Sequence, residues 1–517
     1  MPRESQRKAF KYGHKSRGEI GTATHSVRVA DLKERLDRAA AAKQCTLPRM
    51  TSASKYDAII VGAGVSGSFI AHELTQSGMK CIALEAGRHF SRGTYPRNEL
   101  DANGKLYWGG GIELNTDASI GILRPKAVGG GSIVNQALMD RFDHVAFDSW
   151  REVSGIGDLS PEGLASWYDE AEKRINIQTV PVEYRNGNAE IFRRGFENNG
   201  YRWAPLKRAQ GDCHFEAGND CIECLAGCRI DSKQSTAVAV LPRALDAGLT
   251  LVPEFEAKQV SLTPGDVAVT GVDHAGTTVR YEGRNLVMAA GAIGNSKLLL
   301  ASGLGKKLPR LGENFFSHPQ YMTIALYDEA VNAHRGPLQS FKSDDPNFRR
   351  SGFKLENVFA PPVALAMLLP GFGRDHLKLM REVRHFACIE VAVRDTNPGR
   401  IRVGRGGKAT VEKSLNREDA ARRDRGLIAV YNIFRSTGAK RIIDGKLPIS
   451  LHLMGGCNLG TDPARSVVGP DFRFHGFHNA FAADSSVFPN APGINPSLTI
   501  MALSLKAADR IRREARA

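Results

Sequence analysis

The chain has 517 residues and a mass of 56.2 kDa, which exceeds the usual size of a single hydrophobic core and indicates two closely joined domains. Its hydrophobic content of 42% and charged content of 24% are ordinary for a globular protein. No apolar stretch is long enough to predict a membrane-spanning helix, and the N-terminus lacks the apolar core of a signal peptide. We therefore expect a cytoplasmic protein.

The net charge of +15 is concentrated near the N-terminus, where residues 1–50 carry 12 Lys or Arg against 5 Asp or Glu. We interpret residues 1–52 as a basic N-terminal extension with a solvated surface. A basic arm also suits contact with a membrane surface or with an acidic partner protein, and nothing in it indicates specific nucleic-acid binding.

A dinucleotide-binding motif follows this extension. The β-rich run Asp57-Ala-Ile-Ile-Val61 predicts a buried strand and leads into a loop with Gly62, Gly64 and Gly67. The first glycine permits a tight turn, the second lets a pyrophosphate approach the backbone, and the third allows a helix to pack closely on the strand. Glu85 ends the next strand, 18 residues after Gly67, where a carboxylate accepts hydrogen bonds from ribose hydroxyls. The set predicts a site for FAD or NAD.

A second glycine-rich loop lies further along the chain. Gly129, Gly130 and Gly131 are consecutive, so backbone amides can approach a flat or anionic ligand closely. Ser132 and Asn135 would add hydrogen bonds at the far end of an extended cofactor. The alternative is a loop with a purely structural role.

The motifs, taken in order, resemble those of the glucose–methanol–choline (GMC) oxidoreductases, a family of FAD enzymes. Besides the glycine loops, Met288–Ser296 is similar to the family's second signature, although Asn295 stands where Ser or Thr is usual. Phe481–Pro489 is similar to the segment whose Asp, here Asp484, lies beside the FAD phosphates and ribityl chain. The nearest branch is that of the sterol oxidases and long-chain alcohol oxidases. The resemblance implies FAD, bound non-covalently because no His lies between Tyr107 and Met139.

Two short motifs near the C-terminus supply the expected chemistry. His452 begins His-Leu-Met-Gly-Gly-Cys, and Asn495 lies in Pro-Gly-Ile-Asn-Pro-Ser. The resemblance implies that His452 accepts the hydroxyl proton of an alcohol, since an imidazole is an effective base near neutral pH. Asn495 would donate to the developing alkoxide without becoming charged.

Glu356 is a third candidate, because relatives carry a substrate-side Glu in the middle domain. A solvated carboxylate at a strand edge is the alternative. The aliphatic and proline-rich run from Val358 to Phe372 predicts a pocket wall or lid, or part of the core. His318 lies where the substrate domain should begin, and we assign it no role.

Four cysteines form a cluster, Cys213, Cys221, Cys224 and Cys228. The spacing partly matches a ferredoxin motif, but Arg229 replaces the Pro expected after the final Cys. We expect thiols and no metal ion. The alternatives are an iron–sulfur cluster, zinc or a disulfide.

The expected fold class is α/β, or α+β overall. A discontinuous Rossmann-like FAD-binding domain would comprise 53–145, 236–312 and 446–517. An antiparallel-sheet substrate-binding domain would comprise 313–445, with strands at 389–394 and 401–403 around the Asn397-Pro-Gly399 turn. Residues 146–235 would form an irregular insertion that carries the cysteine cluster.

The predicted activity is FAD-dependent oxidation of an alcohol to an aldehyde or ketone, with an apolar substrate such as a sterol or long-chain alcohol. Oxygen or another electron acceptor would reoxidise the flavin. One alternative is a sugar or polyol dehydrogenase that passes electrons to a partner. Another is a non-redox or photochemical lyase or decarboxylase on the same scaffold.

Overall fold

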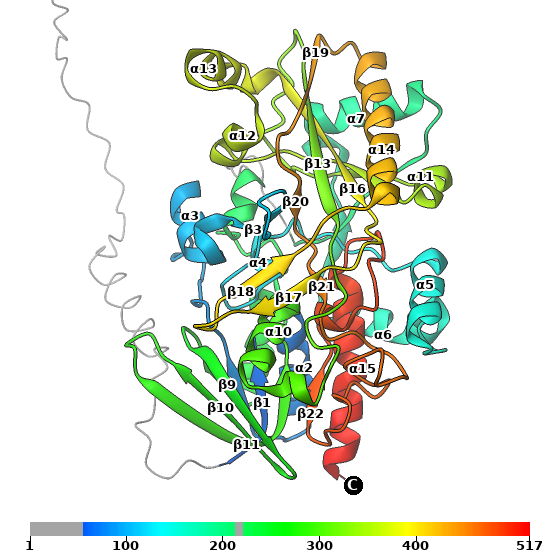
Figure 1. Ribbon diagram of the computed structural model, residues 1–517. Coiled ribbons are helices and arrows are strands. Elements are labelled where there is room, and N and C mark those ends of the chain that lie inside the picture. The colour runs from blue at the N-terminus through cyan, green and yellow to red at the C-terminus, as the bar shows by residue number, and fades with distance from the viewer. Residues whose placement is uncertain (1–54, 212–220, 517) are drawn as a thin grey trace, which may run out of the picture. The chain divides into compact units, whose positions relative to one another are not determined.

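A computed structural model of the chain describes residues 55–211 and 221–516 (Figure 1). The basic extension expected at residues 1–52 lies outside the described residues, as does Cys213. None of the described helices is long and apolar enough to cross a membrane.

The first sheet has a parallel centre, as the dinucleotide-binding motif predicts. Within the described part of the chain it contains seven strands in the order β8-β2-β1-β11-β10-β9, with β22 paired to β11. Strands β8, β2, β1, β11 and β22 run parallel, and β9, β10 and β11 form an antiparallel meander. Their bounds are β1 Tyr56–Val61, β2 Cys81–Leu84, β8 Thr250–Val252, β9 Glu256–Thr263, β10 Asp266–Val272, β11 Thr278–Met288 and β22 Ala480–Ala482.

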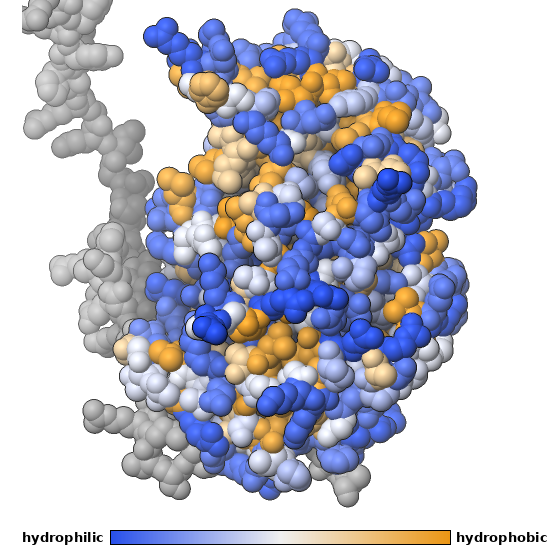
Figure 2. All heavy atoms as spheres, in the orientation of Figure 1, coloured by the Kyte–Doolittle hydropathy of each residue, from blue (hydrophilic) through white to orange (hydrophobic). Residues whose placement is uncertain are grey.

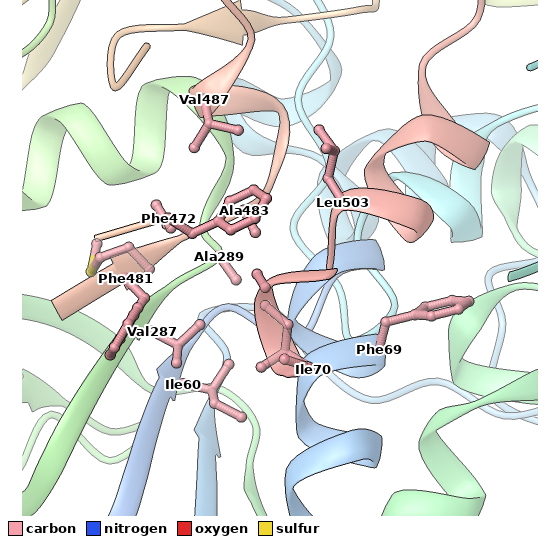
Figure 3. Close-up of a cluster of buried hydrophobic side chains, with 14 of the residues drawn as sticks. Ile60, Phe69, Ile70, Val287, Ala289, Phe472, Phe481, Ala483, Val487 and Leu503 are labelled. Carbon is pink, nitrogen blue, oxygen red and sulfur yellow. The ribbon is translucent and has the colours of Figure 1, made fainter. Parts of the chain in front are cut away.

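Helices α2 (Val65–Gln76) and α15 (Ser497–Arg516) pack against each other and cover this sheet (Figure 1). Strands β1 and β2 at the parallel centre are buried on both faces, which explains their continuous apolar sequence. Figure 3 shows part of the resulting core, where Ile60 and Val287 of the sheet lie near Ile70 of α2 and Leu503 of α15. This core fixes the two helix N-termini at the carboxyl edge of the sheet.

The second sheet is largely antiparallel. Among the described residues its strands follow the order β3-β4-β20-β13-β16-β15-β14-β6, with β19 also paired to β13, and only the β20–β4 pair is parallel. Their bounds are β3 Glu113–Leu114, β4 Gly121–Ile122, β6 Trp203–Pro205, β13 Pro319–Leu326, β14 Phe341–Ser343, β15 Phe353–Asn357, β16 Phe386–Val393, β19 Arg441–Asp444 and β20 Ile449–Ser450.

The two faces of the second sheet differ in chemistry. Helices α7 (Gly187–Asn198) and α14 (Arg417–Ser436) pack on one face, over the apolar residues Leu355 and Val391. Because side chains alternate along a strand, the neighbouring residues Lys354, Glu356 and Glu390 point to the other face. That face is turned toward the first sheet's carboxyl edge, where the cavity described below lies.

Several segments join the second sheet from outside 313–445. Strands β3 and β4 come from the expected FAD-binding segment 53–145, and β20 comes from 446–517. The insertion expected to be irregular, 146–235, contains helices and contributes β6. Both strands predicted around the Asn397-Pro-Gly399 turn form. The second of them, β17, pairs with β18 and not with β16.

The remaining elements are short connections and covering helices. The helices are α3 Glu99–Leu106, α4 Gly131–Val134, α5 His144–Ser154, α6 Pro161–Lys173, α8 Thr236–Ala239, α9 Leu241–Asp246, α10 Gly291–Ala301, α11 Pro346–Arg350, α12 Pro362–Leu368 and α13 Gly373–Arg381. The short strands are β5 Ile177–Thr179, β7 Lys207–Ala209, β12 Phe315–Phe316, β17 Arg400–Val403, β18 Ala409–Glu412 and β21 Met454–Gly455. Figure 2 shows one face of the molecule, where hydrophilic residues surround separate groups of apolar ones.

Candidate active site

One cavity of about 810 Å³ extends from the first glycine loop to His452. Its size is within the range of cofactor and ligand sites. Gly67, Gly129 and Ser132 do not line it. The other residues predicted to bind cofactor or substrate do line it, namely Gly62, Gly64, Glu85, Gly130, Gly131, Asn135, Glu356, His452, Asp484 and Asn495.

The first glycine loop is packed too tightly for side chains. A Cβ on Gly67 would lie 1.9 Å from the carbonyl oxygen of Gly62. A Cβ on Gly62, where φ is +102°, would lie 2.4 Å from the carbonyl oxygen of Ala289. Gly67 therefore acts as the sequence predicted, by letting α2 pack on β1, and α2 begins with its backbone amides toward the cavity.

The second glycine loop lies directly against the first. The Gly129 N–H donates to the carbonyl oxygen of Ala63 at 2.7 Å, and a Cβ on Gly130 would lie 2.8 Å from the Cα of Gly64. The Ser132 hydroxyl donates to the carbonyl oxygen of Gly129 at 2.6 Å and so closes the loop instead of facing the cavity. The two loops form a side-chain-free cradle, which fits the pyrophosphate of a dinucleotide.

Glu85 is held by backbone groups. Its carboxylate accepts from the N–H of Ala63 at 2.9 Å and from the N–H of Gly87 at 2.7 Å. Burial raises the pKa of Glu85 to about 7, against the opposing effect of these two donors. Glu85 lines the cavity, where ribose hydroxyls would donate to its carboxylate.

The Asp484 carboxylate contacts the first residue of α10 and is held by Asn295 of the same helix. The Gly291 N–H donates to Asp484 Oδ2 at 2.7 Å, and the Asn295 amide donates to the same oxygen at 3.0 Å. Burial raises the pKa of Asp484, although these donors act in the opposite direction. Asn295, the one departure from the family's motif, therefore orients Asp484 together with the Ser486 hydroxyl, which donates to Asp484 Oδ1.

His452 contacts a second histidine. Its Nδ1 lies 3.0 Å from Nδ1 of His318, and the Gly493 N–H donates to Nε2 of His318 at 2.9 Å. Burial lowers the pKa of His452 to about 4, while the Glu356 carboxylate acts in the opposite direction. Burial also lowers the pKa of His318 well below its usual value, and His452 adds to this effect. Both imidazoles are therefore neutral near pH 7.

Asn495 is oriented by a buried lysine. The Lys354 ammonium donates to Oδ1 of Asn495, so the amide carbonyl points away from a ligand and the NH₂ group is left to donate. Asn495 lines the same cavity as His452. The structure thus brings together the proton acceptor and the hydrogen-bond donor that the sequence predicted 43 positions apart.

Two models of the GMC oxidoreductase family match the sequence, over residues 56–320 and 409–504. The chain belongs to the GMC oxidoreductase family. GMC oxidoreductases are FAD-dependent enzymes that oxidise alcohols, and this chain is one of them. The sequence prediction of family, FAD cofactor and enzyme class is confirmed, and non-covalent binding of the FAD stays a prediction.

Known proteins resemble this GMC oxidoreductase along most of its length. An uncharacterized GMC-type oxidoreductase of Sinorhizobium fredii is 30% identical, covering 88% of this chain and 94% of that protein. A long-chain-alcohol oxidase of Arabidopsis thaliana is 26% identical, covering 87% and 67%. The crystal structure of pyridoxine 4-oxidase from Mesorbium loti has a TM-score of 0.69 at 15% identity, covering 88% and 99%, and supports the predicted fold.

A polar surface of this GMC oxidoreductase forms one side of the cavity near His452. We call it the polar floor and define it as Gln320, Gln339, Glu356 and Glu390. Lys354 Nζ lies 2.6 Å from Glu356 Oε1 and 2.9 Å from Asp140 Oδ2. Glu356 is only 1% exposed and lies on an inner strand, so the alternative of a solvated edge carboxylate is wrong.

Charge is balanced behind the polar floor. Asp140 accepts from both Lys342, at 2.5 Å, and Lys354. Burial opposes ionisation of Asp140, but the two ammonium groups outweigh it and hold its pKa below the usual range. Burial and the adjacent Glu356 raise the pKa of Glu390 well above its usual value.

An apolar wall also lines the cavity. It is formed by the segment predicted as a wall, lid or core, and we define it as Val358, Phe359, Pro361, Pro362, Met367 and Leu368. Glu99 of α3 fixes its helix, because the Glu99 carboxylate accepts from the N–H of Val363 at 2.6 Å and of Ala364 at 2.8 Å. These are free amides of the first turn of α12.

Part of the cysteine cluster is described. Cys224 and Cys228 are buried, and burial raises the pKa of Cys228. Cys213 and the side chain of Cys221 lie outside the described residues. The choice between thiols, a cluster, zinc and a disulfide therefore stays a prediction.

Sequence reasoning missed the residues that support the predicted pair. His318 was noted without a role, and Lys354, Asp140, Gln320 and Glu390 were not considered. The available signal for Lys354 was its place two positions before a predicted catalytic glutamate, which in a strand puts both side chains on one face. No local pattern identifies Gln320 or Glu390, since their place in the site depends on strand register.

Proposed function

We propose that this GMC oxidoreductase oxidises a CH–OH group of an alcohol with an apolar body to an aldehyde or ketone. His452 accepts the hydroxyl proton, and the Asn495 amide donates to the same oxygen. The observation that carries this proposal is that both side chains line one cavity and that each is oriented from behind, by His318 and by Lys354.

The cofactor fits the residues present. The Gly64 and Gly130 backbones, Glu85 and Asp484 offer amides and carboxylates around a cradle without side chains. FAD bound there supplies the acceptor for the hydride that leaves the alcohol carbon. The protein's part is to position the alcohol, to take its proton and to exclude water from the polar groups.

Asn495 stabilises the oxygen as negative charge develops. Its Oδ1 is occupied by the Lys354 ammonium, so the amide dipole is fixed with its hydrogens toward the ligand. A fixed donor needs no reorganisation during the reaction, and loss of one such donor typically costs a factor of about 10²–10³ in rate. The Lys354 charge also favours a negative oxygen nearby.

The histidine pair sets a condition on proton transfer. Because the Gly493 N–H donates to His318 Nε2, a neutral His318 carries its proton on Nδ1 and donates it to His452 Nδ1. The proton of a neutral His452 then lies on Nε2. His452 accepts at Nε2 only after the pair adopts the other tautomers, which gives up the Gly493 hydrogen bond at a cost of about 1–3 kcal/mol.

This condition can be measured directly. Nitrogen-15 shifts of histidine-labelled resting enzyme should show His452 protonated on Nε2 near pH 7. A resting His452 protonated on Nδ1 would contradict the assignment of His318 as donor and His452 as acceptor in their hydrogen bond.

The apolar wall supports an alcohol with an apolar body. Val358, Phe359 and Met367 face the cavity from α12 and the segment before it. Burial of apolar substrate surface against such a wall contributes about 25 cal/mol per Å². The relative from Arabidopsis thaliana is named as a long-chain-alcohol oxidase, which agrees with such a substrate.

The test is anaerobic titration of the holoenzyme with sterols, long-chain alcohols, sugars and polyols while flavin absorbance is recorded. Wild-type flavin should be reduced by at least one class, and admission of air would then show whether oxygen is the acceptor. His452→Ala should bind FAD normally and reduce it about 10²–10⁴ times more slowly. Reduction of that variant at the wild-type rate would refute the role of His452.

A flavin that no alcohol reduces would refute alcohol oxidation and favour a non-redox or photochemical enzyme. Lys378→Ala is a suitable matched control for His452→Ala, because Lys378 is exposed on α13. It should leave the rate of flavin reduction unchanged.

A further inference from the structure

The peptide that joins Pro492 to Gly493 lies behind the histidine pair. Its N–H, which belongs to Gly493, donates to Nε2 of His318 at 2.9 Å, and Nδ1 of His318 lies 3.0 Å from Nδ1 of His452. The segment 488–496, all of which is described, contains no helix or strand that would hold this peptide in place. The direction of its N–H therefore depends on side chains from other segments.

Arg349 of α11 contacts the other side of the same peptide. Its Nη2 donates to the carbonyl oxygen of Pro492 at 2.8 Å, and its Nη1 lies 3.5 Å from the carbonyl oxygen of Gly493. A peptide unit is planar and its C=O and N–H point in opposite directions, so a bond to the Pro492 oxygen fixes where the Gly493 N–H points. The guanidinium also polarises the peptide and strengthens its N–H as a donor.

The Arg349 guanidinium is itself held in place. It binds the Asp143 carboxylate through two hydrogen bonds, of 2.8 and 2.7 Å. Burial opposes ionisation of Asp143, but the bonds from Arg349 outweigh it and hold the pKa of Asp143 below its usual range. Asp143 also caps α5, since it accepts from the Ala146 N–H at 3.0 Å. At the other end, Phe348 packs α11 into the core of the second sheet. The guanidinium therefore has a fixed position.

Arg394, the neighbouring cation, does not bond to this peptide. Its Nε donates to the carbonyl oxygen of Ala491 and its Nη2 to that of Val145, both at 3.3 Å. Within residues 55–211 and 221–516, Arg349 is the one side chain that bonds to the Pro492 oxygen. Loss of Arg349 should therefore release the peptide.

We propose that Arg349 is a positioning residue, which fixes the proton positions of the histidine pair through the Pro492–Gly493 peptide. While the peptide is held, His318 accepts at Nε2 and donates from Nδ1, and His452 carries its proton on Nε2. The other tautomers put a proton on His318 Nε2, which then faces the Gly493 N–H. The peptide must turn to separate these two donors, and turning takes the Pro492 oxygen away from Arg349.

This role of Arg349 rests on the proposed function, because it concerns the step in which His452 accepts the hydroxyl proton at Nε2. That step needs the tautomers that the held peptide disfavours, so removal of Arg349 should lower their cost. Asn495 is held separately by Lys354 and should keep its place. A variant without Arg349 should therefore reduce flavin faster, whereas loss of a merely structural contact should not.

The first test is the nitrogen-15 spectrum of histidine-labelled holoenzyme without substrate. Arg349→Met keeps most of the side chain's length but loses its charge and its donors. The fraction of His452 protonated on Nδ1 should rise by about 2- to 12-fold, as expected for the loss of one hydrogen bond. Arg349→Lys keeps the charge and a donor for the Pro492 oxygen, so its spectrum should return toward that of the wild type.

Arg350→Met is the matched control. Arg350 is the next residue of the same helix, is exposed, and bonds through its side chain to Asn347. This variant removes the same charge and should leave the His452 spectrum unchanged. Flavin content and thermal unfolding show whether each variant is folded. Should Arg349→Met fail to fold, Asp143→Asn keeps the cap of α5 but removes the charged partner of Arg349, and it should raise the same fraction to a smaller extent.

The second test is stopped-flow flavin reduction by an alcohol that reduces the wild type. The limiting rate constant of Arg349→Met should rise by the same factor as the Nδ1-protonated fraction of His452, and that of Arg350→Met should not change. An unchanged fraction in Arg349→Met, or an equal change in the two variants, overturns the role of Arg349. A changed fraction without a faster rate supports that role and contradicts the tautomer condition in the proposed function. Absence of flavin reduction by any alcohol overturns the proposed function, while the spectra still decide the role of Arg349.

Discussion

The cofactor end and the substrate end of the cavity are built in different ways. At the cofactor end, Gly62, Gly64 and Gly130 bring backbone amides together in a space that excludes side chains. At the substrate end, Glu356 and Glu390 reach the cavity from β15 and β16, and their position depends on which residues pair across the strands. The first arrangement is encoded within short segments, and the second is encoded only in the assembled sheet.

Buried carboxylates show the same contrast. Glu85 at the cofactor end is held by two backbone N–H groups, and burial still raises its pKa to about 7. Asp140 at the substrate end is held by two lysines, which outweigh burial and lower its pKa. At the cofactor end, the partial charges of backbone N–H groups are sufficient for a carboxylate that binds neutral hydroxyls. At the substrate end, the full charges of the lysines orient the Asn495 amide beside an oxygen that becomes negative.

The largest expected effect is at the cofactor end. Gly67→Ala places a Cβ 1.9 Å from a carbonyl oxygen of β1's loop, so the protein should lose at least about 3 kcal/mol of unfolding free energy and be isolated without FAD. Gly131→Ala is the control, because no protein atom lies within 4 Å of its added Cβ. It should fold normally. Thermal unfolding and the flavin-to-protein absorbance ratio measure both variants.

Gly131→Ala also locates the cofactor. Any loss of FAD affinity in this variant reports the cofactor's approach to the backbone, and a loss of about tenfold corresponds to 1.4 kcal/mol. If Gly67→Ala instead bound FAD and unfolded like the wild type, the claim that the glycine loop at the cofactor end is too closely packed for side chains would be wrong.

Lys354→Met tests the substrate end and has the next largest effect. It leaves Asp140 with one lysine and Glu356 with none, all in buried positions, so we expect a loss of about 3–5 kcal/mol in unfolding free energy. Flavin reduction should also slow, because the Asn495 amide is no longer oriented. Chemical denaturation and stopped-flow reduction measure the two effects.

Lys378→Ala is the matched control for this lysine. Its pair with Asp375 has side chains that are 76% and 88% exposed, and such pairs contribute less than about 1 kcal/mol. Equal destabilisation by Lys354→Met and Lys378→Ala would show that the buried ion pairs of the substrate end stabilise the protein no more than an exposed pair does.

The contrast also explains what the sequence could predict. The glycine loops and Glu85 were found because each lies in a motif whose spacing is set by one turn or one helix start, whereas Asp484 was found through a family motif. His452 and Asn495 were found through family motifs. The partners Lys354 and His318 could not be assigned, since their contacts join residues 141 and 134 positions apart. Strand exchange between segments, such as β3 and β4 joining the second sheet, has no local signature either.

A third prediction concerns pH and the substrate end. The pKa of His452 is lowered from about 6.5 to about 4 by burial, so the imidazole is neutral at every pH well above 4. Since proton acceptance needs the neutral form, the rate of flavin reduction should stay level from about pH 8 to about pH 5 and fall as the pH drops through 4. Stopped-flow rates across this range test it. A decline centred near pH 6.5 would show a solvated His452 and contradict the burial of this end.

The smallest expected effect lies at the wall that closes the substrate end. Glu99→Leu removes the acceptor for two amides at the start of α12, a loss of about 0.5–2 kcal/mol by analogy with helix capping. Because α12 carries Met367 and Leu368 of the wall, the loss should fall on substrate binding: KM should rise by about 2- to 30-fold, the factor equivalent to that energy, while kcat changes little. Glu99→Gln keeps one acceptor oxygen and should show a smaller rise. Lys105→Ala, at an exposed position on the same helix α3, serves as the control, with KM unchanged. A fall in kcat with constant KM would contradict this prediction. It would mean that α3 and α12 affect the reacting groups and not the binding of substrate at the wall.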